Sequence, residues 1–387
     1  MLTTAALDRL ASSGMGLLVA SAVLPRLLTR RRFDRERERL RFYWPYADAG
    51  DADRTFLRPP PGVPVQVRRA RCGQFAPRDI PHRRLSFDSP FVPLHPELQR
   101  SYLRHARNRR AHALHYYHPD GPRPTLIFLH GYTLPQYRIN SAWFCLPWFY
   151  RKGYDVLLAQ LPFHGERRER GHPFSGYGFF ADGFAHFNEA VLQGVHDVRV
   201  WLDYLLSEGA PSVGVSGLSL GGYITSAVAT VEDRLAFAIP NSPVVSLFDM
   251  AREWQPSGRL LDFAVWRSGA TLTELRHGVA LHSPLTYAPR LPAERQFIIA
   301  GAGDRFTAPR FVRQLHEHWQ GSRLHWFPGN HLIHVQQGDY LRRMKAFMDR
   351  HSQPSPPPPP SPSRGWEQKI SSPPSEGLAN ERIHRGP

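Results

Sequence analysis

The sequence contains little lysine and cysteine, and it has no long hydrophobic run. Only Cys72 and Cys145 are cysteines, which excludes a disulfide framework and a cysteine-based zinc or iron–sulfur site. No stretch of 18 or more uncharged apolar residues occurs, which excludes a polytopic membrane protein. Hydrophobic residues make up 41% of the 387 residues and charged residues 21%, which is typical of a globular protein with a sizeable core.

The net charge of +16 comes almost entirely from arginine, because only three of the 49 basic residues are lysine. The arginines are scattered through every segment of the chain. This distribution indicates a composition bias rather than a focused phosphate-binding face. We therefore expect a small-molecule partner and no nucleic acid.

Residues 1–50 are expected to form an N-terminal helical extension. A mildly apolar stretch, 10–28, precedes an arginine-rich run, 30–41, in which acidic residues allow i,i+4 pairs on a solvated helix. An amphipathic helix could pack on the domain or make a peripheral membrane contact. The triplet Ala20-Ser21-Ala22 leaves secretion open, but the mixed charges before it favour a cytoplasmic protein.

The remainder of the chain divides into a domain, residues 51–350, and a proline-rich tail, residues 351–387. The tail contains the run Pro356–Pro360 and is expected to be disordered. Within the domain, residues 51–110 are expected to wrap the core as strands and loops, and short β-rich runs then alternate with helical patterns. The β-rich runs are 113–117, 125–129, 155–159, 212–216, 235–239, 296–300 and 323–327.

The alternation of strands and helices predicts the fold class. Runs 113–117 and 125–129 flank a Pro-Asp-Gly-Pro turn and are expected to form a hairpin. Apolar residues at steps of three or four predict a helix over 184–205. The fold is therefore expected to be α/β, with a mostly parallel sheet flanked by helices.

The strongest local signal for chemistry is Gly217-Leu218-Ser219-Leu220-Gly221-Gly222. It lies between a predicted strand and a predicted helix, where Gly-x-Ser-x-Gly forms a nucleophile elbow. A serine needs an adjacent imidazole to remove its proton, and the imidazole needs a carboxylate to fix its tautomer. Ser216 is the rival nucleophile, but no glycine follows it two residues later.

Three further loops follow predicted strands, and the candidate residues occur in the chain order Ser, then Asp, then His. An early strand leads into His130-Gly131-Tyr132, and the backbone N–H groups of Tyr132 and Leu220 are expected to form an oxyanion hole. A later strand precedes Asp304, and the last strand precedes His331. These loops are expected at the carboxyl ends of the strands, where open parallel sheets build their sites.

Over about residues 111–350 the sequence resembles the α/β-hydrolase superfamily. The resemblance implies the α/β-hydrolase fold, with Ser219 as nucleophile, Asp304 as acid and His331 as base. The segment from 161–167 through Ser219 is similar to the family of α/β-hydrolase domain-containing protein 18. No metal or organic cofactor is expected.

Several alternatives stay open from the sequence alone. Asp249 competes with Asp304 as the acid, capping of the following helix is the structural alternative for Asp304, and His334 competes with His331 as the base. His112, His115 and His118 are spaced by three, but on a strand this spacing alternates faces, so a structural role is favoured over a metal site. His164 is either a pocket residue or an ordinary loop histidine, and the aromatic residues 143–149 are either core residues or pocket residues.

The insertion 246–289 is expected to form a small helical cap over the site, or else a pair of packing helices without a lid function. The predicted function is a serine hydrolase that cleaves a carboxylic ester through an acyl-enzyme on Ser219. An acyl-peptide or dipeptidyl-type peptidase shares the same residues. A non-catalytic scaffold and a binder of anionic surfaces are the alternatives from other functional classes.

Overall fold

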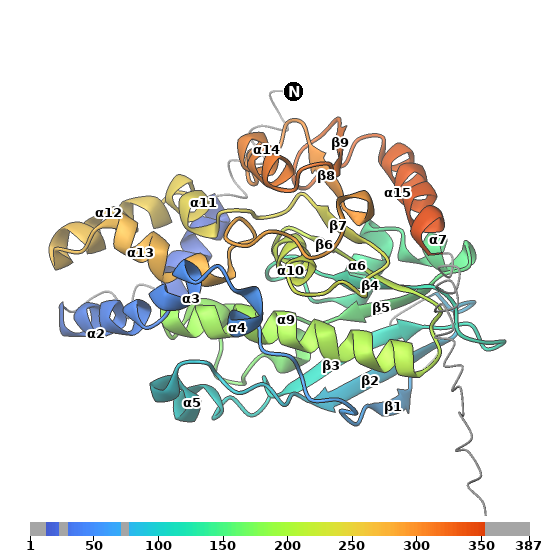
Figure 1. Ribbon diagram of the computed structural model, residues 1–387, viewed down its shortest axis with the longest axis horizontal. Coiled ribbons are helices and arrows are strands. Elements are labelled where there is room, and N and C mark those ends of the chain that lie inside the picture. The colour runs from blue at the N-terminus through green and yellow to red at the C-terminus, as the bar shows by residue number, and fades with distance from the viewer. Residues whose placement is uncertain (1–12, 23–29, 71–76, 353–387) are drawn as a thin grey trace, which may run out of the picture. The chain divides into compact units, whose positions relative to one another are not determined.

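A nine-stranded sheet forms the centre of the computed structural model, which describes residues 13–22, 30–70 and 77–352 (Figure 1). The spatial order of its strands is β1-β2-β3-β5-β4-β6-β7-β8-β9. β1, β2 and β3 are antiparallel to their neighbours, and the other six strands, β5, β4, β6, β7, β8 and β9 in spatial order, run parallel to one another. The strands are β1 (Gln66–Arg69), β2 (His82–Asp88), β3 (Arg110–Tyr116), β4 (Thr125–Leu129), β5 (Asp155–Ala159), β6 (Val213–Leu218), β7 (Ala238–Asn241), β8 (Phe297–Gly301) and β9 (Arg323–Phe327).

Helices cover both faces of this sheet, so the expected fold class is confirmed (Figure 1). In chain order the helices are α2 (Arg30–Arg41), α3 (Trp44–Asp48), α4 (Ala52–Thr55), α5 (Pro96–Tyr102), α6 (Tyr137–Trp143), α7 (Leu146–Arg151), α8 (Tyr177–Phe180), α9 (Phe184–Ser207), α10 (Leu220–Ala229), α11 (Leu247–Glu253), α12 (Ser257–Ser268), α13 (Leu272–Gly278), α14 (Pro309–His318) and α15 (Gln337–His351). Three 3₁₀ turns are η1 (Gly165–Arg167), η2 (Ala280–His282) and η3 (Ala293–Arg295), and residues 13–22 are also helical. The helix predicted over 184–205 corresponds to α9.

The side chains of β4 show how the two faces are filled. Ile127 and Leu129 belong to the apolar cluster that includes α9, α10 and α14, whereas Leu126 and Phe128 belong to the cluster that includes α6, α7 and α15. Successive side chains of a strand point to opposite faces. A central strand that is apolar at every position is therefore buried on both sides, as parallel sheets require.

The hairpin expected from 113–117 and 125–129 is wrong. β5 lies between β3 and β4, with Ala159 opposite both Ala113 and Leu129. The turn between β3 and β4 crosses the start of β5, where the Asp155 carboxylate accepts the backbone N–H of His118 at 3.0 Å. The turn residues act only locally and do not determine which strands pair. β5 pairs with the edge of β4 and thereby separates β4 from β3.

The arginine-rich helix α2 packs on the domain, one of its two expected placements. Phe33 and Leu40 are buried, and the carboxylate of Glu36 accepts the N–H of Ala185 at 2.7 Å, in the first turn of α9. A negative charge at a helix N-terminus is favourable. The helix is therefore joined to the core and is not fully solvated as its charge pattern suggested.

The other expectations for the ends of the chain depend partly on residues outside the described ranges. The expected tail lies almost wholly in residues 353–387, which are not described. Insertion 246–289 contains three helices, α11, α12 and α13 (Figure 1). Among the described residues, no helix is long and apolar enough to cross a bilayer.

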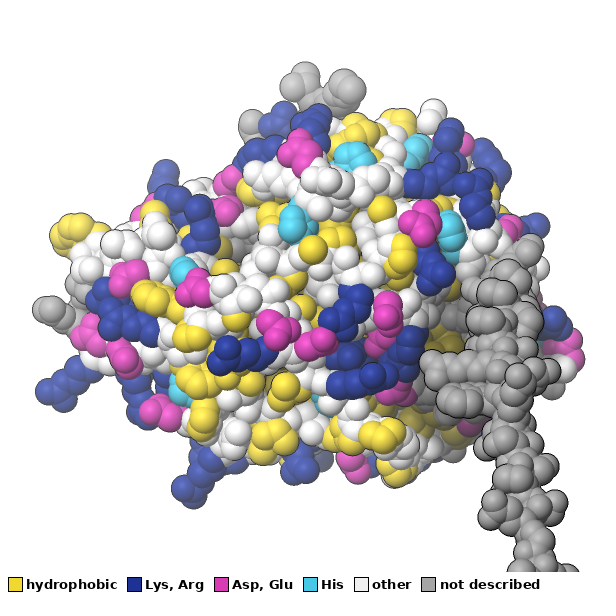
Figure 2. Space-filling model, in the orientation of Figure 1, with side chains coloured by type: hydrophobic (Ala, Val, Ile, Leu, Met, Phe, Trp, Pro, Cys, Tyr) yellow, Lys and Arg dark blue, Asp and Glu magenta, His cyan; other side chains and the backbone are white. Residues whose placement is uncertain are grey.

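Basic and acidic side chains are interspersed on the molecular face shown in Figure 2. Two ion pairs illustrate this pattern, Arg290 with Asp53 at 2.6 Å and Arg234 with Asp203 at 2.7 Å. Pairs of this kind between exposed groups contribute little stability, typically about 0–1 kcal/mol. The absence of nucleic-acid binding and the contact with a membrane stay predictions.

His282 gives the fold a specific dependence on pH. Its Nδ1 accepts the Tyr223 hydroxyl at 2.6 Å and its Nε2–H donates to the Asn188 side chain at 3.0 Å, which joins η2 to α10 and α9. Burial lowers the pKa of His282 to about 3 from its ordinary value of 6.5. As the pH falls, His282 is therefore protonated near pH 6.5 in the unfolded chain but only near pH 3 in the folded chain. The neutral, buried His282 contributes its full stabilisation above pH 6.5, and this stabilisation is lost progressively as the pH falls from 6.5 to 3.

We expect the unfolding free energy of His282→Gln to depend less steeply on pH than that of the native chain. The difference in slope should approach about 1.4 kcal/mol per pH unit between pH 4.5 and 6. Urea unfolding at several pH values measures it. Parallel pH dependences for the two proteins would show that His282 is already protonated in the folded state.

Candidate active site

Ser219 lies at a sharp turn between β6 and α10. Its backbone angles are φ 55° and ψ −111°, a strained conformation for a residue with a side chain. The turn is held in place because the N–H of Ser219 donates to Asn241 at 3.0 Å, and its carbonyl accepts from Tyr223 and Val244. The hydroxyl is thus presented from a rigid corner, as the Gly-x-Ser-x-Gly motif predicts.

The glycines on either side of Ser219 are required by space. A Cβ atom on Gly217 would lie 2.5 Å from the carbonyl oxygen of Gly221. A Cβ atom on Gly221 would lie 2.2 Å from the carbonyl oxygen of Leu129, at the end of β4. Both contacts are far closer than side chains tolerate. The two glycines therefore allow β6, the turn and β4 to meet behind Ser219.

Asp304 and His331 are brought together although 27 residues separate them. Oδ2 of Asp304 lies 2.9 Å from Nδ1 of His331, and both side chains are buried. The other oxygen of Asp304 accepts the N–H groups of Phe306 and Thr307 at 2.8 and 2.7 Å. Such bonds orient a carboxylate, so the Nδ1–H tautomer of His331 is favoured and Nε2 is left as the proton acceptor.

Two neighbours of this pair were not identified from the sequence. The hydroxyl of Thr307 donates to Oδ2 of Asp304 at 2.6 Å, and the ring of Phe306 stacks on His331 with centroids 4.4 Å apart. The threonine could have been found from its position three residues after the aspartate, which is the spacing of a local side-chain turn. The stacking of Phe306 depends on the tertiary fold and has no comparable local signal.

The backbone N–H groups of Tyr132 and Leu220 donate no hydrogen bond to another group in the described part of the chain. Leu220 is the first residue of α10, so its N–H is one of the unpaired donors of a helix N-terminus. A Cβ atom added to Gly131, just before Tyr132, would lie 3.7 Å from the Cβ atom of Ser219. Both N–H groups are therefore available as donors, and their role as an oxyanion hole stays a prediction.

The competing candidates have other partners. The Ser216 hydroxyl donates to the carbonyl of Ile239 at 2.7 Å, within the sheet. Nδ1 of His334 lies 2.8 Å from the Tyr340 hydroxyl, and burial lowers the pKa of His334 to about 4. Asp249 pairs with Arg276 in the cap region. Among the described residues, none of these three side chains hydrogen-bonds to the side chain of Asp304 or of His331, whereas the predicted acid and base bond to each other.

The histidines at 112, 115 and 118 do not assemble a metal site among the described residues. His115 accepts a hydrogen bond from Arg83 at 3.1 Å, and burial lowers its pKa to about 3. His118 contacts the Asp155 carboxylate at 2.8 Å. His115 and His118 thus have protein partners at β2 and at the start of β5, and a structural role for the three histidines stays a prediction.

His164 lies immediately behind the predicted oxyanion hole. Its ring centroid is 5.4 Å from that of Tyr132 and 5.0 Å from that of His130. Burial is the main cause that lowers the pKa of His164 well below its ordinary value, so the ring is neutral. It therefore supports Tyr132 from the protein side.

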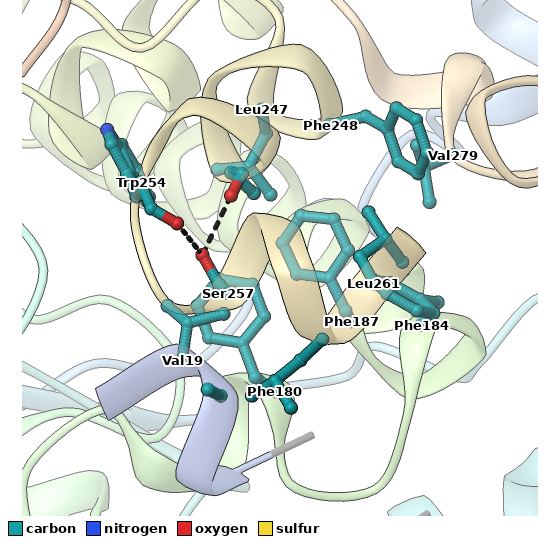
Figure 3. Close-up of a pocket in the computed structure, with 13 residues that line it drawn as sticks. Val19, Phe180, Phe184, Phe187, Leu247, Phe248, Trp254, Ser257, Leu261 and Val279 are labelled. Atoms are coloured by element: carbon teal, nitrogen blue, oxygen red, sulfur yellow. Dashed lines mark hydrogen bonds between the residues drawn. The ribbon is translucent and has the colours of Figure 1, made fainter. Parts of the chain in front are cut away.

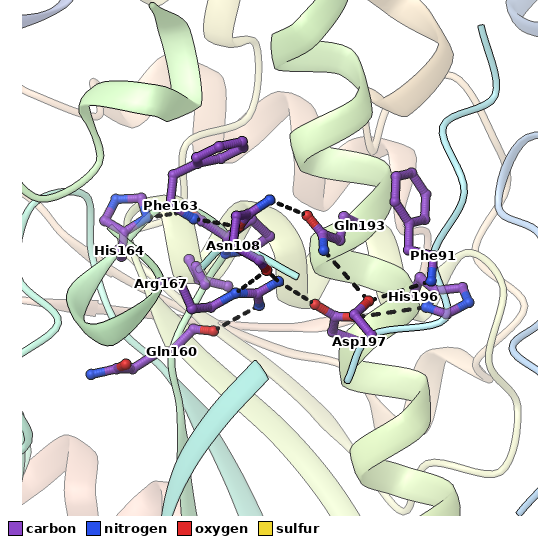
Figure 4. A network of polar contacts seen from close by, with 12 residues as sticks. Phe91, Asn108, Gln160, Phe163, His164, Arg167, Gln193, His196 and Asp197 are labelled. Atoms are coloured by element: carbon purple, nitrogen blue, oxygen red, sulfur yellow. Dashed lines mark hydrogen bonds and ion pairs between the residues drawn. The ribbon is translucent and has the colours of Figure 1, made fainter. Parts of the chain in front are cut away.

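A buried polar network fixes the loop that carries His164 (Figure 4). The Arg167 guanidinium donates to the carbonyl of Asn108 at 2.8 Å and to that of Gln160 at 3.2 Å, and it lies 2.8 Å from the Asp197 carboxylate of α9. Burial opposes the ionisation of Asp197, but Arg167 and His196 hold the pKa of this carboxyl below its ordinary value. The loop after β5 is thereby tied both to the chain before β3 and to α9.

Removing the cation from this network should be costly. We expect Arg167→Met to lower the unfolding free energy by about 3–5 kcal/mol, because Asp197 would stay buried without its partner. Arg290→Met is the matched control, since it removes an arginine from an exposed pair and should cost about 0–1 kcal/mol. Chemical denaturation measures both, and equal losses would show that the buried network does not carry the stability assigned to it.

Comparisons with known proteins agree with the overall fold. The structure resembles an acetyl xylan esterase from Paenibacillus sp. R4, with a TM-score of 0.53 and 15% identity over 80% of this chain and 93% of the other. Acetyl xylan esterase 1 from Thermoanaerobacterium sp. JW/SL YS485 gives 0.54 and 16%, over 81% and 94%. These identities are low, so the likeness concerns the fold, which is that of the α/β-hydrolases.

The chain has the α/β-hydrolase fold. It forms one family with the "Uncharacterized protein Rv2627c" of Mycobacterium tuberculosis, to which it is 32% identical over 303 residues. The alignment covers 76% of this chain and 69% of the mycobacterial one. No family model matches this chain, and its resemblance to the α/β-hydrolase domain-containing protein 18 family stays a prediction.

Proposed function

We propose that the protein is a serine hydrolase that cleaves a carboxylic ester through an acyl-enzyme on Ser219. Two observations support this most strongly: the Asp304–His331 hydrogen bond, and the strained turn after β6 that presents Ser219. A protein that only binds a ligand has no need for an oriented imidazole, a buried carboxylate and two free N–H donors around one serine.

The proposed reaction has two steps. His331 Nε2 removes the hydroxyl proton of Ser219 as the Ser219 oxygen attacks the ester carbonyl carbon. The resulting tetrahedral oxyanion accepts hydrogen bonds from the backbone N–H groups of Tyr132 and Leu220. His331 then gives the proton to the leaving alcohol, and the carbon–oxygen bond breaks. Water attacks the acyl-enzyme with the same histidine as base, which releases the acid and restores the serine. Asp304 stays ionised throughout and stabilises the imidazolium.

A fluorophosphonate probe tests this proposal. Such a reagent modifies serines that are activated by a base and an oxyanion hole. We expect one probe per molecule, with the mass increase on the peptide that contains Ser219. A folded protein without labelling would contradict the proposal and favour the non-catalytic scaffold.

The same active-site residues would also serve the peptidase alternative. Matched p-nitrophenyl ester and p-nitroanilide substrates with the same acyl group distinguish the two. We expect the enzyme to cleave the ester faster than the anilide, and the ratio of the two rates to exceed the ratio of the uncatalysed hydrolysis rates of the two substrates. A rate on the anilide that approaches the rate on the ester would favour the peptidase.

A further inference from the structure

A narrow cavity lies between the helices of insertion 246–289 and the core (Figure 3). Thirteen residues line it, from the N-terminal helical residues 13–22, from α8 and α9, and from α11, α12 and the end of α13. The space between them is about 680 Å³ when the part open to solvent is included. The enclosed part of this space is much smaller, about 50 Å³, so the cavity is a narrow slot.

The lining of this cavity is almost wholly apolar. Twelve of the thirteen residues are hydrophobic, and the remaining one is Ser257. The Ser257 hydroxyl lies 2.7 Å from the carbonyl oxygen of Ala251 and 2.6 Å from that of Trp254, so its hydrogen-bonding capacity is used within the protein (Figure 3). Among the residues that the structure describes, no charged side chain lines the cavity. Its walls therefore favour a hydrocarbon and offer nothing to a polar or charged group.

Two aromatic side chains connect the cavity with the active site. Phe180 lines the cavity and packs against Tyr132, with ring centroids 5.3 Å apart. Trp254 also lines it and stacks on Phe306 at 4.6 Å, and Phe306 in turn stacks on His331. The cavity is thus one side chain away from the oxyanion donor on one side and from the base on the other.

We infer that this cavity binds the acyl chain of the substrate, and that the enzyme prefers esters of unbranched aliphatic acids of several carbons over acetates. This inference rests on the proposed function. With the carbonyl carbon at Ser219 and its oxygen at the Tyr132 and Leu220 N–H groups, the chain enters between Phe180 and Trp254. The leaving alcohol stays on the opposite side of the carbonyl, outside the cavity.

The N-terminal helical residues 13–22 complete this acyl cavity. Val19 and Ala20 line it, and Gly16 lies so close to the cap that a Cβ atom there would be 2.7 Å from the carbonyl oxygen of Gln255. A larger residue at position 16 would force the segment away from the cap. The substrate preference therefore depends on a part of the chain that lies far from Ser219 in the sequence.

The experiment compares p-nitrophenyl acetate, butyrate, hexanoate and octanoate. Each methylene that is buried in the transition state should raise kcat/KM by about 2- to 4-fold, which makes the octanoate better than the acetate by about 10²-fold or more. If the acetate is the best substrate and kcat/KM falls with chain length, the cavity does not bind the acyl chain although the proposed function stands. If no ester is cleaved and Ser219 is not labelled by the fluorophosphonate, the proposed function itself fails.

Variants locate the preference in the cavity. Ala251→Phe adds a ring to its wall and should lower the octanoate-to-acetate ratio of kcat/KM about 10-fold or more. Leu17→Phe is the control, because Leu17 belongs to the same N-terminal helical residues but is 60% exposed and does not line the cavity, and its ratio should equal that of the native enzyme. Gly16→Val displaces the N-terminal wall without filling the cavity and should also lower the ratio. Labelling of Ser219 by the fluorophosphonate shows that each variant is folded, and an unchanged ratio in labelled Ala251→Phe and Gly16→Val would overturn the inference.

Discussion

Ser219→Ala is expected to lower kcat for ester hydrolysis by about 10³–10⁶ while leaving the protein folded. The loss is large because the hydroxyl is the atom that forms the acyl-enzyme, and the imidazole and the N–H donors cannot replace it. The loss of stability should be small, because the Ser219 hydroxyl makes no hydrogen bond to another described group. Backbone bonds hold the turn, and alanine keeps all of them.

Ser216→Ala is the matched control for this variant. It removes the same atom from a serine three residues earlier in the same strand, where the hydroxyl donates to the carbonyl of Ile239. We expect it to retain activity and to lose about 0.5–1.5 kcal/mol of unfolding free energy. Steady-state kinetics and chemical denaturation separate the two effects. Activity in Ser219→Ala close to that of the native protein would exclude Ser219 as the nucleophile.

His331→Ala is expected to be almost as severe as Ser219→Ala, and His334→Ala mild. His331 is buried and His334 is half-buried, and only His331 contacts the Asp304 carboxylate, which fixes the tautomer and stabilises the imidazolium. His334 contacts the Tyr340 hydroxyl and the aromatic ring of Phe327, so its removal should cost packing and leave the proton transfers intact.

The same ester assay, together with thermal unfolding, distinguishes these roles. His331→Ala should keep a melting temperature near that of the native enzyme and lose activity, whereas His334→Ala should lose stability with only a small change in kcat. The opposite ranking in kcat would show that His334 is the base. It would also leave the Asp304–His331 bond as a structural feature of the loop after β8.

The sequence predicted those parts of the site that depend on local pattern. A glycine on each side of Ser219, and an aspartate and a histidine each placed just after a strand, are visible in short windows, and the topology of a parallel sheet then brings these windows together. The fold class followed for the same reason. The order of neighbouring strands did not, because the position of β5 between β3 and β4 is decided by which strand fills the edge of β4.

Other features depend on contacts between segments far apart in the chain. Arg167 stands in a run of charged residues that reads as a solvated surface, yet it is fully buried against Asp197 of α9. Phe306 is one of many phenylalanines until the fold stacks it on His331. The role of Val19 and Ala20 in a cavity wall could not be inferred either, because an apolar N-terminal stretch is compatible with a signal, a membrane helix or a packed helix.

The insertion of β5 between β3 and β4 has a consequence for how the protein folds. During synthesis β3 and β4 emerge early, but neither can complete its pairing until residues 155–159 follow, and the second edge of β4 waits for residues 213–218. Non-local pairing of this kind slows folding and leaves strand edges open to other chains. Refolding yield should therefore fall as protein concentration rises. Until β5 and β6 have paired with it, the open edges of β4 are the part of the chain most exposed to pairing with other molecules.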